Sequence, residues 1–126
     1  MLLETLFAAG VGAALYGGIE LAWRGRTHWT MLLAGGTCFA VMYLIATRTD
    51  WPLWGKWVSS AAVITAVEFV TGAIVNMRLG WNVWDYSALP MNLMGQICPL
   101  YTLYWLLLSV PGTALCGGIS RWVFGH

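Results

Sequence analysis

The sequence predicts an all-α, polytopic membrane protein with four transmembrane helices in a single domain covering residues 1–126. Hydrophobic residues make up 60% of the chain and charged residues only 9%, whereas a soluble domain is about 25% charged. The apolar residues also gather into four long stretches, and a spanning helix needs about 20 of them. Four spans and their connections use nearly all of the residues. They leave no room among them for a soluble catalytic or nucleotide-binding domain.

The four predicted spans lie at about residues 2–23, 31–47, 57–77 and 97–119. The first is unlike a cleaved signal peptide, which begins with positive charge and has a short apolar region. It starts with the acidic segment Met1-Leu2-Leu3-Glu4 and is full length, so we expect it to remain in the mature protein. Both termini then lie on one side of the membrane, here named side B. The connections after the first and third spans lie on the opposite side, named side A.

Positive charge does not orient the chain. The basic residues are Arg24, Arg26 and Arg78 on side A, and Arg48, Lys56 and Arg121 on side B. Such residues usually gather on the cytoplasmic side. A balance of three against three indicates either that six charges are too few to decide, or that the chain inserts in both orientations and pairs antiparallel. The net charge of +1, with no basic cluster, excludes a nucleic-acid partner.

Tryptophans mark the predicted ends of the spans. They are Trp23, Trp29, Trp81 and Trp84 on side A, and Trp51, Trp54, Trp57 and Trp122 on side B. Aromatic residues at both membrane–water interfaces are typical of spanning proteins. For Trp81 and Trp84, an aromatic cage for a cation is an alternative.

Small residues follow one stripe of the first predicted helix, at Gly10, Ala14 and Gly18. In lipid, such stripes let two helices approach closely, because association depends on backbone packing. The stripe predicts either close packing within the chain or a seam between two copies of it.

No metal site and no cofactor are predicted. The three cysteines, Cys38, Cys98 and Cys116, have no zinc or iron–sulfur spacing, and their odd number argues against a disulfide framework. A lone histidine is a weak metal signal. The chain also has no Gly-Lys-Ser/Thr phosphate loop, so any coupling to ATP would need a separate partner protein.

Glu68 is the charged residue whose predicted position in the hydrocarbon core is the least favourable. It lies ten residues before Arg78, which places it about 15 Å from side A, near the middle of a hydrocarbon core about 30 Å thick. Intramembrane acids usually mark ion or substrate pathways. Gly72 and Asn76 share its helical face at four-residue spacing. The alternative is a carboxyl group that only hydrogen-bonds a neighbouring helix.

Glu20, Arg24 and His28 form a second polar group, spaced by four residues at the end of the first span. If the helix continues this far, the carboxylate and guanidinium can pair on one face, with the imidazole one turn further. Arg24 and His28 would supply positive charge or a proton relay at the mouth of a site. The alternative is an interfacial ion pair and a loop histidine.

The connection from Arg78 to Gln96 carries the third group. It mixes apolar residues with Asp85, Asn92 and Gln96, so it predicts a structured connection, re-entrant or interfacial, before the last helix. The alternative is a surface loop with ordinary turn chemistry. Topology brings all three groups to side A. We therefore predict a cavity open to side A, with Glu68 at its floor and this connection as its lid.

Several segments resemble one family of small bacterial membrane proteins. They are Gly17-Gly18-Ile19-Glu20, Arg24 to Met31, Glu68-Phe69-Val70-Thr71-Gly72 with Asn76, Trp84-Asp85-Tyr86-Ser87 with Pro90 and Asn92, and Gly95-Gln96-Ile97-Cys98. The chain is similar, over roughly residues 16–109, to CmpB-like proteins labelled putative ABC-transporter type IV. The resemblance implies a multi-pass protein of the bacterial inner membrane. It implies no solute, mechanism or catalytic residue.

These observations favour a transporter or channel-like protein for a small polar or ionic solute, assembled as a homo-oligomer in the lipid bilayer. Glu68 would be the proton or cation site, and Asn76, Asp85, Asn92 and Gln96 would coordinate the solute. The less favoured alternative is an integral-membrane enzyme acting on a lipid or lipid-linked substrate. A third is a non-catalytic interaction subunit. A route past Glu68 to both membrane faces favours transport, and a closed pocket that opens sideways to lipid favours the enzyme.

Overall fold

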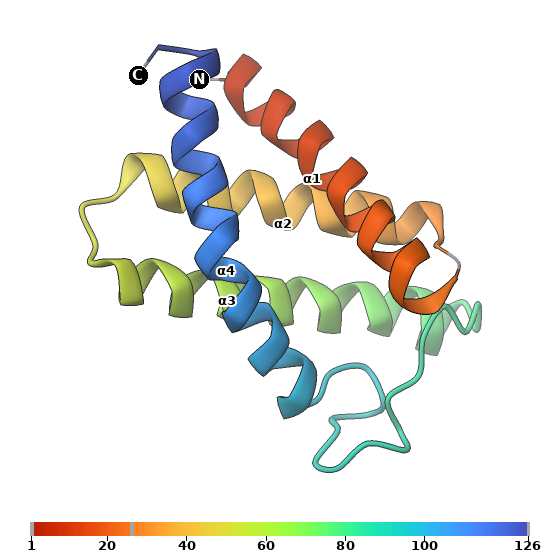
Figure 1. The fold of residues 1–126 in the computed structure, drawn as a ribbon. Coiled ribbons are helices and arrows are strands. Elements are labelled where there is room, and N and C mark those ends of the chain that lie inside the picture. Colours follow the sequence, from red (N-terminus) through yellow and green to blue (C-terminus); the bar gives the residue numbers. More distant parts are fainter. Residues whose placement is uncertain (1, 26, 126) are drawn as a thin grey trace.

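The computed structural model describes residues 2–25 and 27–125, which form helices and connecting loops (Figure 1). Helix α1 covers Leu2–Arg24, α2 Trp29–Arg48, α3 Leu53–Gly72 and α4 Pro99–Gly118. The last two continue into π-helical turns, η1 at Ala73–Arg78 and η2 at Ile119–Val123. Arg26, one of the predicted side A charges, lies outside the described residues.

All four helices are long and apolar enough to cross a membrane. The predicted fold class is therefore confirmed, and the chain is a multi-pass membrane protein. The second and third spans extend beyond the predicted limits, because the helices include tryptophans and basic residues that the apolar stretches alone left out. Large apolar side chains remain exposed along every helix, among them Leu6, Leu33, Val70 and Leu107. Lipid is the solvent that such surfaces require.

Local sequence explains where the helices begin and end. Gly25, directly after α1, has φ 73°, a conformation that glycine adopts without steric cost and that ends helices. The ring of His28 caps α2 by accepting a hydrogen bond from the backbone N–H of Thr30 (3.2 Å). Pro99 occupies the first turn of α4, where its missing N–H breaks no helical hydrogen bond.

Helices that are consecutive in the sequence form two antiparallel pairs. α1 packs against α2, α3 packs against α4, and α2 joins the two pairs by contacting both α3 and α4. α2 and α3 run side by side, while α1 and α4 cross them and diverge from a point near the two termini (Figure 1). Near that point the rings of Phe7 and Phe124 lie 5.5 Å apart. Further along, the rings of Tyr16 and Trp105 lie 5.9 Å apart across the widening gap.

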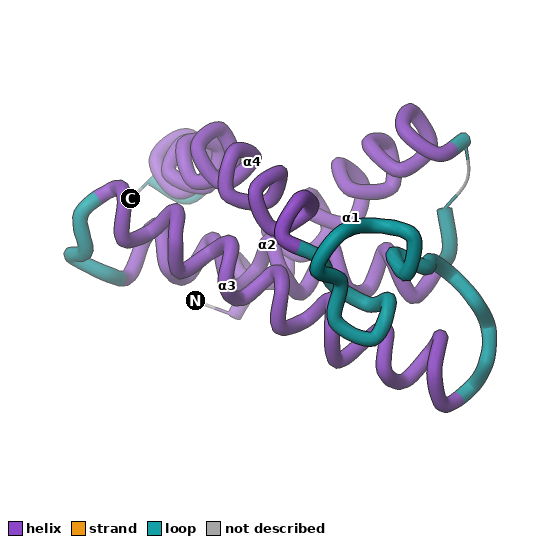
Figure 2. Tube along the Cα trace, turned by 90° about the horizontal axis from the view of Figure 1, so that it is seen from below, coloured by secondary structure: helices purple, strands orange, loops and turns teal. Residues whose placement is uncertain are grey.

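The connection between η1 and α4 has a defined fold without regular secondary structure (Figure 2). Leu93 and Ile97 form an isolated antiparallel bridge, and the backbone N–H of Tyr86 donates to the carbonyl of Gly95 at 2.7 Å. The structured connection predicted before the last helix is therefore present. Its re-entrant position in a bilayer stays a prediction.

The tryptophans divide into two groups. Most of those near helix ends are exposed, as an interfacial belt requires; they are Trp23, Trp29, Trp51, Trp54, Trp81 and Trp122. Placing Trp84 in this belt was wrong, since it is only 5% exposed. Its ring packs with Met31, Val75 and Val83 in the apolar cluster at the side A end of the bundle. It anchors the connection to the helices.

Candidate functional site

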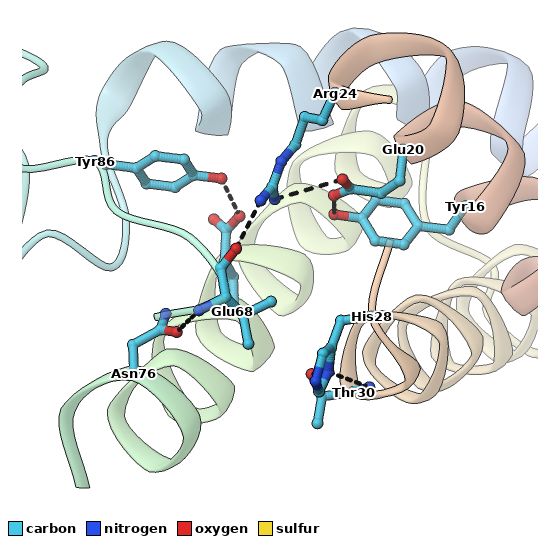
Figure 3. Close-up of polar contacts among 9 residues, drawn as sticks. Tyr16, Glu20, Arg24, His28, Thr30, Glu68, Asn76 and Tyr86 are labelled. Carbon is cyan, nitrogen blue, oxygen red and sulfur yellow. Dashed lines mark hydrogen bonds and ion pairs between the residues drawn. The ribbon is translucent and has the colours of Figure 1, made fainter. Parts of the chain in front are cut away.

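Glu68 lies well inside the continuous helix Leu53–Arg78 that α3 and η1 form, faces inward, and has a relative exposure of 7%. Its Oε2 accepts a hydrogen bond from the Tyr86 hydroxyl at 2.8 Å (Figure 3), and its Oε1 accepts one from the Trp105 indole N–H at 3.3 Å. The connection and α4 thus both reach this carboxyl group. Of the described residues, no lysine, arginine or histidine forms an ion pair with it. The carboxyl group is held by neutral donors.

A cavity of about 250 Å³ lies beside Glu68, between all four helices. Its walls are almost entirely apolar, with the phenol of Tyr16 and the carboxyl of Glu68 as the notable polar groups. The other contributors include Gly12, Met31, Ala34, Cys38, Phe39, Met42, Ile64, Val67, Trp84, Trp105 and Pro111.

The cavity opens sideways between α1 and α4. Leu15 and Ile19 of α1 and Leu108 and Leu115 of α4 line it, and each is 40–46% exposed. All four lie within the spans and away from the helix ends, so a molecule dissolved in the bilayer could approach Glu68. The predicted opening toward side A is not observed. Trp84 lines the cavity at that end, and the connection that carries it closes the site as the predicted lid would.

Two of the predicted solute ligands instead join the connection to η1. The Asn76 amide donates to Gln96 Oε1 at 2.9 Å and accepts from the backbone N–H of Val83 at 2.6 Å. The Trp84 indole N–H donates to the Gln96 carbonyl at 3.0 Å. Gly72 lies directly under this contact, and a Cβ there would meet Gln96 and Trp84. Asn76 and Gln96 therefore lie beside the site and do not line the cavity.

Two others, Asp85 and Asn92, shape the connection itself. Asp85 is exposed and accepts a hydrogen bond from the backbone N–H of Ser87 at 2.9 Å, which lowers the pKa of its carboxyl. The Asn92 amide donates to the carbonyl of Leu89 at 2.9 Å and accepts from the backbone N–H of Gly95 at 2.9 Å. Neither residue lines the cavity. Their coordination of a solute stays a prediction.

Glu20 and Arg24 form the predicted pair at the end of α1 (Figure 3). Their side chains approach at 3.4 Å, and the Tyr16 hydroxyl donates to Glu20 at 2.9 Å. Glu20 is only 6% exposed and the Arg24 side chain 25%, so the pair is largely shielded from solvent. Arg24 also donates to the carbonyl of Val83 at 2.6 Å. It therefore ties α1 to the start of the connection.

His28 does not continue this helical face. The helix ends at Arg24, and the chain turns at Gly25 before His28 caps α2. The imidazole therefore lies in a separate pocket, together with Arg24, and not one turn further along α1.

Sequence reasoning missed the residues that hold the carboxyl groups. Tyrosine hydroxyls donate to all three glutamates: Tyr16 to Glu20, Tyr43 to Glu4, and Tyr86 to Glu68. The four-residue spacing of Tyr16 and Glu20 is a local signal that could have been found. The other two pairs join segments 18 and 39 residues apart, for which a single sequence gives no signal.

Within residues 2–25 and 27–125, no group of three or more metal-binding side chains lies close enough to hold a metal ion. No solved structure matches the chain at a significant level. A family model described as "Putative ABC-transporter type IV" matches residues 21–121. With its four spanning helices, the chain is thus a membrane protein linked to transport. It belongs to the CmpB-like family of putative ABC-transporter type IV proteins.

Proposed function

We propose that this protein is a transport protein of the bacterial inner membrane, and that its cavity binds a small amphipathic solute with a cationic end. The observation that carries the proposal is the position of Glu68. Its carboxyl group lines an apolar cavity and has two neutral hydrogen-bond donors but no cationic partner among the described residues. Apolar walls suit the body of such a solute, and the carboxylate suits its charge.

The charge balance near the cavity supports a cationic ligand. Glu20 and Glu68 are both buried, and Arg24 forms an ion pair with Glu20. An acidic side chain at the centre of a bilayer costs about 2.5 to 3.5 kcal/mol on insertion scales. A proton or a cationic solute would remove that cost at Glu68. The proton and the cationic solute would compete for the same carboxyl group. This competition is the basis for exchanging a proton for a solute molecule.

The remaining predicted site residues have supporting roles in this proposal. Asn76 and Gln96 fasten the connection, Asp85 and Asn92 fold it, and Tyr86 brings it to Glu68. The apolar lining changes the expected solute from a small polar ion to an amphipathic molecule.

We also propose that the protein is a homo-oligomer. The stripe of Gly10, Ala14 and Gly18 is exposed, and a Cβ added at Gly10 or Gly18 would meet nothing within 4 Å. The glycines that pack against α2 are instead Gly12 and Gly17. This supports the interpretation of the stripe as a seam between copies, because α2 does not use it.

A shape-matched pair of ligands tests the binding proposal. Benzyltrimethylammonium and neopentylbenzene have the same shape and differ by one positive charge. With the protein in lipid nanodiscs, corrected for partition into empty nanodiscs, we expect the cation to bind and Glu68→Gln to weaken it by about tenfold or more. Binding of neopentylbenzene should be unchanged by the substitution.

Asp50→Asn is the matched control, because it removes an equal charge from an exposed position on side B. Equal losses in Glu68→Gln and Asp50→Asn would contradict a specific site. Transport itself is tested by uptake of benzyltrimethylammonium into proteoliposomes, where Glu68→Gln should abolish uptake driven by a proton gradient.

The sideways opening between α1 and α4 favours one second candidate, an enzyme acting on a lipid or lipid-linked substrate. Glu68 would then serve as its acid or base. Incubation of the protein with a total lipid extract, followed by mass spectrometry, should reveal a product that Glu68→Gln does not form. Binding of the cation without uptake, together with such a product, would favour the enzyme over the transporter.

A further inference from the structure

A second pocket, of about 130 Å³, lies on side A where α1, α2 and the connection meet. Arg24, Thr27 and His28 line it from the α1–α2 side, and Trp81 and Asn82 line it from the connection. Met31 lines both this pocket and the cavity beside Glu68. The pocket is thus a neighbour of the proposed solute site and has its own chemistry.

The polar groups around this pocket are suited to an anion. Arg24 has five N–H donors; it contacts Glu20 at a long 3.4 Å and the Val83 carbonyl at 2.6 Å, so donors remain. Thr27 and Asn82 add a hydroxyl and an amide. No aspartate or glutamate is among the described residues that line the pocket.

The cap of α2 fixes which nitrogen of His28 carries the proton. Nδ1 lies 3.2 Å from the backbone N of Thr30, whose N–H points at it, and 2.7 Å from the Thr30 hydroxyl. With Nδ1 accepting from both groups, the proton of the neutral ring lies on Nε2. The imidazole therefore keeps an N–H donor after capping the helix. A helix cap and an anion donor are combined in one side chain.

Aromatic residues place the pocket at the membrane interface. The His28 ring lies 5.7 Å from that of Trp29 and 5.8 Å from that of Trp81, and these two tryptophans are 57% and 46% exposed. Exposed tryptophans gather at the level of lipid head groups. We infer that this pocket binds the phosphate group of an anionic phospholipid, with Arg24 and His28 as its donors and the two tryptophans beside the glycerol.

Native mass spectrometry of the detergent-solubilised protein tests this inference by titration with phosphatidylglycerol and, in parallel, phosphatidylcholine. We expect phosphatidylglycerol to bind more tightly. Three variants each remove a donor: Arg24→Lys keeps the charge, His28→Asn keeps a capping side chain, and Asn82→Gly keeps the backbone, which has φ 52°. Arg24→Lys and His28→Asn should each weaken binding by about tenfold, and Asn82→Gly by less.

Arg78→Gln is the control, because Arg78 is an exposed charge on side A outside the pocket. It should change the affinity by less than about twofold, since exposed charges contribute little. Equal losses in Arg78→Gln and His28→Asn, or equal binding of the two lipids, would overturn the inference. A calorimetric titration with sn-glycerol 1-phosphate separates the sources. Binding as tight as that of phosphatidylglycerol would retain the phosphate site but assign it to a soluble ligand.

Discussion

Glu4 and Glu68 are both buried glutamates, 5% and 7% exposed, and both accept a hydrogen bond from a tyrosine hydroxyl. They differ in their second partner. Glu4 approaches Arg48 at 3.2 Å, whereas the second donor to Glu68 is the neutral indole of Trp105. Only Glu68 lines the cavity. Burial alone therefore does not mark a functional acid.

Helix position reinforces the difference. Glu4 lies in the first turn of α1, where the positive end of the helix dipole stabilises a negative charge. Glu68 lies well inside the continuous helix Leu53–Arg78, more than two turns from either end. Glu4 is thus compensated by the fold itself. The charge of Glu68 is compensated by no cationic side chain among the described residues, so a cationic ligand could compensate it.

The largest expected effect is on protein stability, which should fall more when Glu4 is replaced than when Glu68 is replaced. Glu4→Gln keeps an amide oxygen for Tyr43 but removes the negative charge that strengthens this hydrogen bond and that the helix dipole stabilises, so it should lower the free energy of unfolding by about 1 to 2 kcal/mol. Arg48 is 42% exposed, so the ion pair itself adds little. Glu68→Gln keeps an acceptor for Tyr86 and should cost less than about 0.5 kcal/mol. Thermal unfolding in detergent measures both, and equal losses would remove the distinction.

The lid over Glu68 can be displaced without touching Glu4. In Gly72→Ala the new Cβ would lie 3.0 Å from the Trp84 ring and against Gln96, so the connection must shift, at a cost of about 1 to 2 kcal/mol. Hydrogen exchange should increase in residues 79–98. Gly55→Ala, in the same helix, is the control, because its Cβ would make only ordinary van der Waals contacts, the shortest at 3.5 Å, and alanine favours the helix. Unchanged exchange in Gly72→Ala would mean that the contact does not hold the lid.

Composition and topology were enough to predict the fold and which segments meet on side A. The four apolar stretches form four helices. Arg24 at the end of α1 and Asn76 of η1 both bond to Val83 of the connection, so these three segments meet on side A as expected. The prediction that Glu68 lies under the connection agrees with its hydrogen bond to Tyr86. These features depend on hydrophobicity and helix geometry, which a single sequence reports well.

The roles of the individual polar residues were less accessible. Asn76 and Gln96 have the polarity of ligands, but their amides bond to each other across 20 residues. Glu4 appeared only as an interruption near the end of a span, because its partners Tyr43 and Arg48 are about 40 residues away. Pairings of this kind depend on how helices rotate and cross. Residue type cannot distinguish a fastening amide from a binding amide.

A smaller effect concerns chemical access to the two carboxyl groups. Dicyclohexylcarbodiimide, an apolar carboxyl reagent, should modify Glu68 through the opening between α1 and α4 and leave Glu4 unmodified. Tyr86→Phe removes one donor to Glu68 and should increase the modification rate by about twofold to fivefold, as expected for a hydrogen bond of about 0.5 to 1 kcal/mol. Tyr43→Phe is the matched substitution at Glu4. Peptide mass spectrometry identifies the modified residue, and equal reaction of Glu4 would show that the cavity gives no selective access.

The smallest expected effect is a pH dependence of hydrogen exchange in the connection that covers Glu68. The backbone N–H of Ser87 lowers the pKa of Asp85 from 3.8, so the charged carboxyl stabilises the turn above about pH 4, and this stabilisation is lost as pH falls through the lowered pKa. Hydrogen exchange in residues 79–98, corrected for its intrinsic pH dependence, should therefore increase in acid. Asp85→Asn keeps the acceptor oxygen but cannot titrate, so its exchange should not show this step. An identical acid step in that variant would assign the titration to another group, whereas its loss would show that the lid over Glu68 responds to pH through Asp85.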